Sequence, residues 1–166
     1  MQKNIFILLG SNLGDRKTLL QRARRAIDNN CGKIVGMSQL YETAPWGFES
    51  EHWFINQVIQ LETDLSPEHL LEKLLAIEAL LGRIRTETQY SSRNIDIDLL
   101  YYNTQIIDNE TLNIPHPRLH LRRFTLLPLT EIAPHFIHPL LQKSQLELLN
   151  ELVDNSVVRR LGYAAN

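Results

Sequence analysis

Ile5-Phe6-Ile7-Leu8-Leu9 is a continuous apolar run, and Gly10-Ser11-Asn12 follow it directly. An uninterrupted, partly β-branched run of this length is typical of a strand buried on both faces, and Gly-Ser-Asn is typical of a turn. The chain is therefore predicted to place a central strand near its start, with a loop after it.

Two amphipathic helices are predicted, one before and one after the middle strands in the sequence. The first begins after Asp15 and closes at residues 28–32, and its basic face is expected to be solvated. That face carries Lys17, Arg22, Arg24 and Arg25. The second begins at Ser66-Pro67, an N-cap with proline at the first helical position, and Gly82 ends it. This second helix has the clearest periodicity in the chain.

Strand-like segments complete the pattern at residues 33–43, 53–63 and 95–102, and residues 103–104 are read as a turn into a short partner strand over 105–107. The resulting order is βαββαβ. This order predicts an α+β fold of the ferredoxin-like type, an antiparallel sheet with both helices on one face. Helical pieces at 119–132 and 145–153 are expected to wrap the sheet, and residues 1–166 to form one domain.

Charge and cysteine content exclude several classes of function. The 166 residues carry a net charge of −2, so no global positive field attracts nucleic acid or anionic lipid, and any phosphate binding must come from local clusters. The single cysteine, Cys31, excludes an intrachain disulfide and a cysteine-based metal cage. The apolar run at residues 5–9 is too short for a signal sequence or a membrane span. A cytoplasmic protein without membrane or nucleic-acid partners is expected.

The strand at residues 95–99 places two carboxylates side by side. Because alternate residues of a strand share a face, Asp96 and Asp98 point the same way, about 7 Å apart, while their apolar neighbours point the other way. At that distance two carboxylates repel by about 2.4 kcal/mol at an effective dielectric of 20. A hard cation such as Mg²⁺ is the natural counter-charge. The alternative is a polar outer strand face.

Arginines flank this pair in the sequence. Arg83, Arg85 and Arg93 precede the strand, and Arg118, Arg122 and Arg123 follow the Ile114-Pro115-His116-Pro117 segment. The arginine fork binds phosphate oxygens bidentately, so arginines around carboxylate-bound Mg²⁺ suit a polyphosphate substrate. Neither a Walker loop nor a dinucleotide fingerprint is present. Each arginine alone could be a surface residue, and His116 could be structural.

Aromatic and amide groups suited to a flat heteroaromatic ring lie in two places. Residues 43–48 form a loop with backbone groups and aromatic side chains, and Phe54-Ile55-Asn56 open the third strand-like segment. Phe54 and Phe124 could instead be core residues.

Taken in order, these segments resemble the 6-hydroxymethyl-7,8-dihydropterin pyrophosphokinase family over about the first 140 residues. The matching segments are residues 9–15, Tyr41-Glu42-Thr43, Phe54-Ile55-Asn56, Glu78 with Leu81-Gly82-Arg83, Arg93 with residues 95–99, residues 114–118, and Arg122-Arg123-Phe124. Each segment alone is weak, whereas the whole series is highly specific.

The resemblance implies transfer of pyrophosphate from ATP to the pterin hydroxymethyl group in folate biosynthesis, with release of AMP. It implies that Asp96 and Asp98 hold two Mg²⁺ ions and that Arg83 and Arg93 clamp phosphates as catalytic residues. The implied nucleotide side adds Glu78, Arg85, Tyr90, His116 and Arg122. The implied pterin side consists of Phe54 and Phe124 stacking on the ring, with Asn56, Thr43, Pro45 and Trp46 along its edge.

One segment departs from the family pattern. Many members carry Trp-Gly-Pro before the arginine, where this chain has Tyr90-Ser91-Ser92. This difference leaves undecided how the loop closes over the site, but it does not change the expected reaction. Two other functions compete with this interpretation: a ferredoxin-like RNA-binding module, and another Mg²⁺-dependent nucleotidyl or phosphoryl transferase. ATP and the pterin are the expected partners of a monomer.

Overall fold

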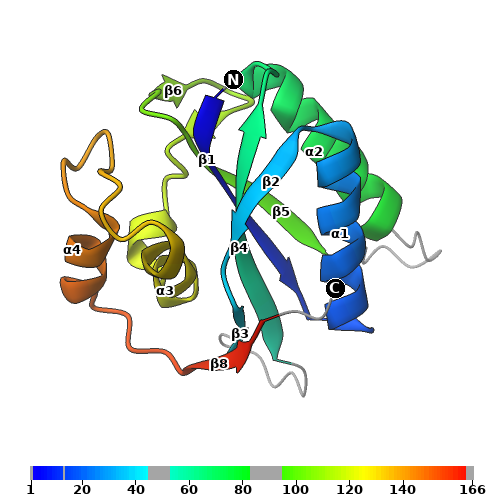
Figure 1. Cartoon of the computed structure of the whole chain (residues 1–166). Coiled ribbons are helices and arrows are strands. Elements are labelled where there is room, and N and C mark those ends of the chain that lie inside the picture. Colours follow the sequence, from blue (N-terminus) through cyan, green and yellow to red (C-terminus); the bar gives the residue numbers. More distant parts are fainter. Residues whose placement is uncertain (1, 13, 45–52, 83–94, 164–166) are drawn as a thin grey trace.

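The computed structural model describes residues 2–12, 14–44, 53–82 and 95–163, and within these ranges it has one six-stranded antiparallel sheet (Figure 1). The strands are β1 (Gln2–Ser11), β2 (Lys33–Met37), β3 (Leu40–Thr43), β4 (Phe54–Thr63), β5 (Asp96–Tyr102) and β8 (Val158–Gly162). Their order is β5-β1-β4-β3-β8. β2 also pairs with β4, along residues 59–62, whereas β3 pairs with residues 54–56. The predicted antiparallel sheet is confirmed.

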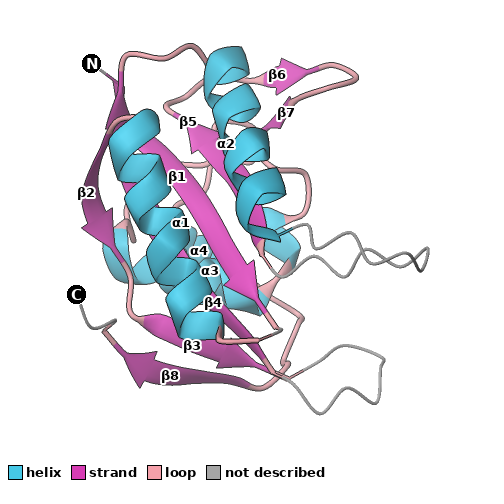
Figure 2. Ribbon diagram, turned by 90° about the vertical axis from the view of Figure 1, so that its right-hand side faces the viewer, coloured by secondary structure: helices cyan, strands magenta, loops and turns pink. Residues whose placement is uncertain are grey.

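The first strand, β1, is an interior strand between β5 and β4, and it is buried on both faces as predicted. Ile5, Ile7 and Leu9 pack against α1 (Arg16–Asn30) and α2 (Pro67–Gly82), which lie next to one another on one face of the sheet (Figure 2). Phe6 and Leu8 point to the other face, which α3 (Arg123–Ile132) and α4 (Gln145–Asn150) cover. The result is three layers, with the C-terminal helices forming the third.

The expected strand over residues 33–43 is two strands, because Ser38 and Gln39 interrupt it. The Ser38 hydroxyl accepts a hydrogen bond from the backbone N–H of Val58 at 3.0 Å, and the Gln39 N–H donates to the Glu131 carboxylate of α3. The Ser38 N–H still donates to the Val58 carbonyl at 2.8 Å, but side-chain groups accept from the Val58 and Gln39 N–H groups, and the regular ladder is interrupted. Since β2 and β3 both pair with β4, they serve together as one strand of the βαββαβ order.

The basic face of α1 is not entirely solvated, contrary to expectation. Arg24 is buried and its Nη1 donates to Gln57 Oε1 of β4 at 2.7 Å. Burial lowers the pKa of this guanidinium. The helical period places Arg24 at the edge of the apolar stripe, where a polar side chain on the sheet can receive it.

The segment after β5 also differs from expectation. Asn103 makes the predicted turn, with φ 52°, but β6 (Ile107–Asp108) pairs with β7 (Asn113–Ile114) and not with β5. The Asn109 carboxamide accepts hydrogen bonds from the N–H groups of Thr111 and Leu112, which closes a separate short hairpin.

The C-terminal helices are shorter than predicted. An extended residue, Arg122, separates the 3₁₀ turn η1 (Leu119–Leu121) from α3, so the expected helix over 119–132 is divided. After α4 the chain adds β8, which the sequence patterns did not predict, at the edge of the sheet beside β3. No helix in the described ranges has both the length and the apolar character needed to cross a bilayer.

Candidate active site

A cavity of about 750 Å³ lies on the α3 face of the sheet, where β1, β3, β4 and β5 meet the start of α3. The sheet contributes Leu8, Gly10, Thr43, Ala44, Phe54, Asn56, Asp96 and Asp98 to its lining. The facing wall consists of Arg118, Leu121, Arg122, Phe124, Val153, Asp154 and Asn155. Segments more than one hundred residues apart in the sequence thus form one hollow.

Asp96 and Asp98 lie on β5 as the alternation predicts. Both line the cavity and are partly exposed, whereas Ile95, Ile97 and Leu99 are buried in the core beneath the first two helices. The two carboxylates therefore share one face at the mouth of a hollow. A strand face that is polar only because it meets solvent would not place both carboxylates in a cavity.

Glu78 lies outside the lining of the cavity. Its Oε2 accepts a hydrogen bond from the backbone N–H of Ile97 at 2.9 Å. Because β5 is the edge strand among the described residues, this contact from α2 satisfies a backbone donor that points away from β1. Glu78 thereby holds the backbone between the two aspartates, and its expected part in nucleotide binding stays a prediction.

Gly10 forms the floor of the cavity between two functional side chains. In the sheet register it lies opposite Asn56 on one side and Asp96 on the other. A Cβ atom at this position would be 2.8 Å from Asn56 Oδ1, closer than real Cβ contacts come. The glycine is therefore required by space, because any side chain here would occupy the place of the Asn56 amide.

Asn56 and its neighbours form an edge-recognising group. The Asn56 side chain is buried, and its Nδ2 donates to Thr43 Oγ1 of β3 at 3.1 Å. Phe54, two residues before Asn56 in β4, lies on the same face and pairs with Thr43 across the ladder. Polar groups held this rigidly beside an aromatic ring are suited to reading the edge of a flat heterocycle.

Phe124 faces this group from α3. Both Phe54 and Phe124 line the cavity and are partly buried, and Phe124 also packs against the core beneath α3, so its expected contact with a bound ring stays a prediction. The Arg122 guanidinium carbon lies 5.5 Å from the centre of the Phe124 ring, within the range of a cation–π contact. This places a cation next to the aromatic wall.

His116 is near the cavity but does not line it. Burial lowers its pKa to about 4, and the positive charges of Arg122 and Arg118 act in the same direction. Its Nδ1 accepts a hydrogen bond from the backbone N–H of Arg118 at 3.2 Å. At neutral pH the ring is uncharged and its proton is on Nε2, so His116 can donate one hydrogen bond and carries no charge.

The buried histidines predict how stability depends on pH. His138 also has its pKa lowered to about 4, by burial first and by His120 second. Because both folded-state values lie below the ordinary 6.5, protonation favours the unfolded chain: this contribution to stability is complete above about pH 6.5 and is lost as the pH falls toward 4. Urea unfolding between pH 7.5 and 4.5 is expected to show that decline.

His138→Asn tests the assignment, because the Asn oxygen can replace Nδ1, which accepts from the N–H groups of Leu140 and Leu141. The variant is expected to lose stability less steeply with falling pH than the parent. The exposed His69 provides the control substitution, His69→Asn, which should leave the slope unchanged. An identical slope in His138→Asn would contradict the prediction.

Six residues predicted for the site lie outside the described ranges, namely Pro45, Trp46, Arg83, Arg85, Tyr90 and Arg93. The described residues bring together Thr43, Phe54, Asn56, Asp96, Asp98, Arg122 and Phe124. The sequence patterns missed Leu121, Val153, Asp154 and Asn155. No local signal marks them: Leu121 enters the wall because the turn η1 precedes α3, and the other three because the segment after α4 returns to the sheet.

The model of the family described as 7,8-dihydro-6-hydroxymethylpterin-pyrophosphokinase matches residues 6–134 of the chain. The chain belongs to this pyrophosphokinase family. A 2-amino-4-hydroxy-6-hydroxymethyldihydropteridine pyrophosphokinase of Porphyromonas gingivalis is 40% identical over 138 residues, covering 81% of this chain and 93% of that one. The Bacillus subtilis pyrophosphokinase is 40% identical over 134 residues, covering 80% of each chain.

Longer relatives contain the same domain. The folic acid synthesis protein of Pneumocystis carinii is 37% identical over 153 residues, which are 92% of this chain and 20% of that protein. A crystal structure of an HPPK–DHPS protein in complex with substrates superposes with a TM-score of 0.74 at 18% identity, covering 90% of this chain and 43% of that one. That superposition confirms the fold, and as a member of the family the chain is a pyrophosphokinase of folate synthesis.

Proposed function

We propose that the cavity on the α3 face holds ATP and 6-hydroxymethyl-7,8-dihydropterin together and transfers pyrophosphate from ATP to the pterin hydroxymethyl group, with release of AMP. One observation carries the proposal: the paired carboxylates of Asp96 and Asp98 line the same cavity as Phe54, Asn56 and Phe124. A phosphate-handling end and a ring-binding end within one hollow are what this two-substrate reaction requires.

The ring-binding end suits a pterin. Phe54 from the sheet and Phe124 from α3 offer two aromatic faces, and a flat ring between them gains contact on both sides. The Asn56 Oδ1 is left to accept from a ring N–H, because the Asn56 amide nitrogen already donates to Thr43. This fixed orientation of the Asn56 amide favours binding of a heterocycle that has an N–H donor at its edge over a heterocycle that lacks such a donor.

The carboxylate end suits Mg²⁺ bound together with a polyphosphate. No group of three or more His, Cys, Asp or Glu side chains in the described part of the chain could enclose a metal ion alone. Mg²⁺ is usually held by one or two carboxylates, waters and substrate phosphates, so Asp96 and Asp98 fit it as a pair. We infer two ions here, which when bound would neutralise the triphosphate and polarise its β-phosphoryl group.

The residues of the chain supply position and charge. Arg118 and Arg122 line the wall opposite the two aspartates and are placed to bind phosphate oxygens entering between them. Asn56 and the two phenylalanines fix the pterin so that its hydroxymethyl oxygen faces the β-phosphorus. Arg83 and Arg93 are proposed to clamp the pyrophosphoryl group as it moves, and the uncharged His116 to donate a hydrogen bond on the nucleotide side.

We further propose that the chain acts as a single-domain monomer in the cytoplasm. Six of the described strands form one sheet with helices on both faces, and a buried free thiol at Cys31 suits a reducing compartment.

Product analysis tests the proposal. Purified protein incubated with ATP, Mg²⁺ and 6-hydroxymethyl-7,8-dihydropterin is expected to release AMP in amounts equal to the pterin consumed, with no product when the pterin is omitted. ADP would indicate transfer of a single phosphoryl group, and pyrophosphate would indicate nucleotidyl transfer. Either product, or none, would overturn the proposed reaction.

A further inference from the structure

The C-terminal segment from Asp154 to Arg159 connects the two walls of the cavity, and we name it the strap. It lies beyond residues 6–134, the part of the chain that matches the family model. Its first residue contacts α3, which carries Phe124, and its last contacts β3 and the start of β4, which carry Thr43 and Phe54.

At the α3 end, the carboxylate of Asp154 makes two hydrogen bonds. Oδ2 accepts from the backbone N–H of Arg123, the first residue of α3, at 3.0 Å, and Oδ1 accepts from the N–H of Ser156 at 2.9 Å. Burial alone would raise the pKa of Asp154, but these hydrogen bonds outweigh it and hold the pKa below the ordinary value. Arg122, the residue before α3, makes no side-chain cap, so Asp154 caps the helix from a distant part of the chain.

At the sheet end, the strap joins β3 as the first part of β8. The Ala44 N–H donates to the Val157 carbonyl at 3.3 Å, and in the ladder Val158 lies opposite Thr43 and Arg159 opposite Glu42. Thr43 and Ala44 line the cavity. The strap therefore runs along the strand that recognises the edge of the ring.

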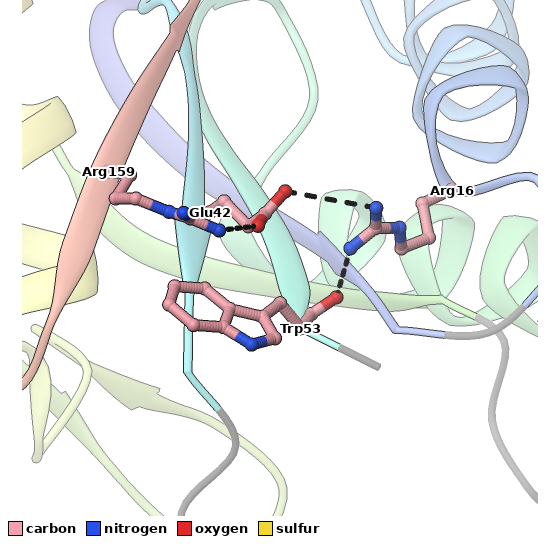
Figure 3. A network of polar contacts seen from close by, with 4 residues as sticks. All are labelled: Arg16, Glu42, Trp53 and Arg159. Carbon is pink, nitrogen blue, oxygen red and sulfur yellow. Dashed lines mark hydrogen bonds and ion pairs between the residues drawn. The ribbon is translucent and has the colours of Figure 1, made fainter. Parts of the chain in front are cut away.

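Arg159 also fastens β3 to the start of β4 (Figure 3). Its Nη2 donates to Glu42 Oε1 at 2.6 Å, and its guanidinium carbon lies 4.1 Å from the centre of the Trp53 ring. Arg16, at the start of α1, approaches Glu42 Oε2 at 3.8 Å and donates to the carbonyl oxygen of Trp53. Glu42 lies between Thr43, which lines the cavity, and Tyr41, whose hydroxyl donates to Glu131 of α3, so this cluster is on the opposite face of the sheet, directly behind the site.

The two walls need a defined spacing. Ring carbons in contact lie about 3.5 to 4 Å apart, so two aromatic faces that enclose one flat ring must be separated by about 7 to 8 Å. Phe54 and Phe124 come from different layers of the fold, a strand and a helix on its surface, and the strap holds both. A gap of about 1 Å between the ring and one wall already loses about a quarter to a half of each contact energy, so a wrong spacing weakens binding of the ring.

We propose that the strap is a positioning element for pterin binding, in which Asp154 within the cavity wall and Arg159 behind the sheet together set the distance between the aromatic walls. The inference rests on the proposed function. It assigns to the C-terminal segment a part in the pterin end of the site, so its loss should weaken pterin binding more than it slows the transfer step.

Steady-state kinetics with each substrate varied in turn test this. Arg159→Ala is expected to raise the KM for the pterin about tenfold while leaving kcat and the KM for ATP within about twofold. Asp154→Ala is expected to raise the pterin KM by a similar factor. A purely structural role would lower the unfolding midpoint and the fraction of active enzyme without altering the KM of the enzyme that remains.

Conservative variants and a matched control complete the design. Arg159→Lys keeps the charge beside Glu42 but loses the planar stacking on Trp53, and Asp154→Asn keeps one of two acceptors, so both should give intermediate pterin KM values. These variants also serve if the alanine variants do not fold. Glu151→Ala, exposed and paired with Lys143, should leave the pterin KM unchanged.

An unchanged pterin KM in both Arg159→Ala and Asp154→Ala, in a parent enzyme that releases AMP, would overturn the inference. Equal effects on the two substrates in Arg159→Ala would overturn it as well. Failure of the proposed function is a separate result, because the unaltered protein would then release no AMP at all.

Discussion

Asp98→Asn is expected to lower kcat by about 10³-fold or more while leaving the fold intact, and Asp96→Asn to do the same. Each substitution keeps the size of the side chain and removes one negative charge from the cavity mouth, where both carboxylates are partly exposed on β5. Catalysis of phosphoryl transfer consists almost entirely of positioning and electrostatic stabilisation, which the proposed Mg²⁺ ions deliver through these two side chains. AMP release measured at saturating substrates gives the effect.

The two aspartates would act as one unit, so their effects should not multiply. The double variant is expected to be little worse than either single variant, because the first substitution already removes most of the metal-dependent rate. Asp108→Asn, exposed on β6 and outside the lining of the cavity, is the matched control and should retain full activity. Near-normal rates in both single variants, with Mg²⁺ present, would remove the metal assignment.

Gly10→Ala is expected to reduce kcat/KM for the pterin about 100-fold. The new Cβ would lie 2.8 Å from Asn56 Oδ1, so the buried amide must move from the place where it meets the ring. A misplacement of about 1 Å can cost about 10²-fold in rate, whereas overpacking of this kind costs about 1–3 kcal/mol of stability. The catalytic loss should therefore appear in protein that remains folded at room temperature.

Gly36→Ala is the matched control for this prediction. Gly36 lies on β2, and the nearest atom to a Cβ there is Gln60 Oε1 at 3.2 Å, at the end of a flexible side chain. Its activity should equal that of the parent, since β2 does not line the cavity. Substrate titrations by pterin fluorescence will separate lost affinity from lost turnover. Parent-like affinity in Gly10→Ala would show that Asn56 does not read the ring edge.

Much of the site could be predicted where a local period aligns the side chains. Asp96 and Asp98 share a face because strand residues alternate, and the structure places both in the cavity. Asn56 and Phe54 follow the same rule on β4. For Arg24 the helical period alone was insufficient, since its burial depends on Gln57 of β4 being in reach to accept a hydrogen bond.

The sequence by itself determined the buried first strand, the two covering helices and the paired carboxylates. It could do so because these features depend on residues within a few positions of one another, where strand and helix periods select the buried face. Only the tertiary structure decided that the residues after α4 return to the sheet, that Asp154 caps α3, and that Arg159 fastens Glu42 and Trp53 behind the cavity. Contacts between segments 31 and 117 residues apart have no local signal, because chain packing alone brings their side chains within reach.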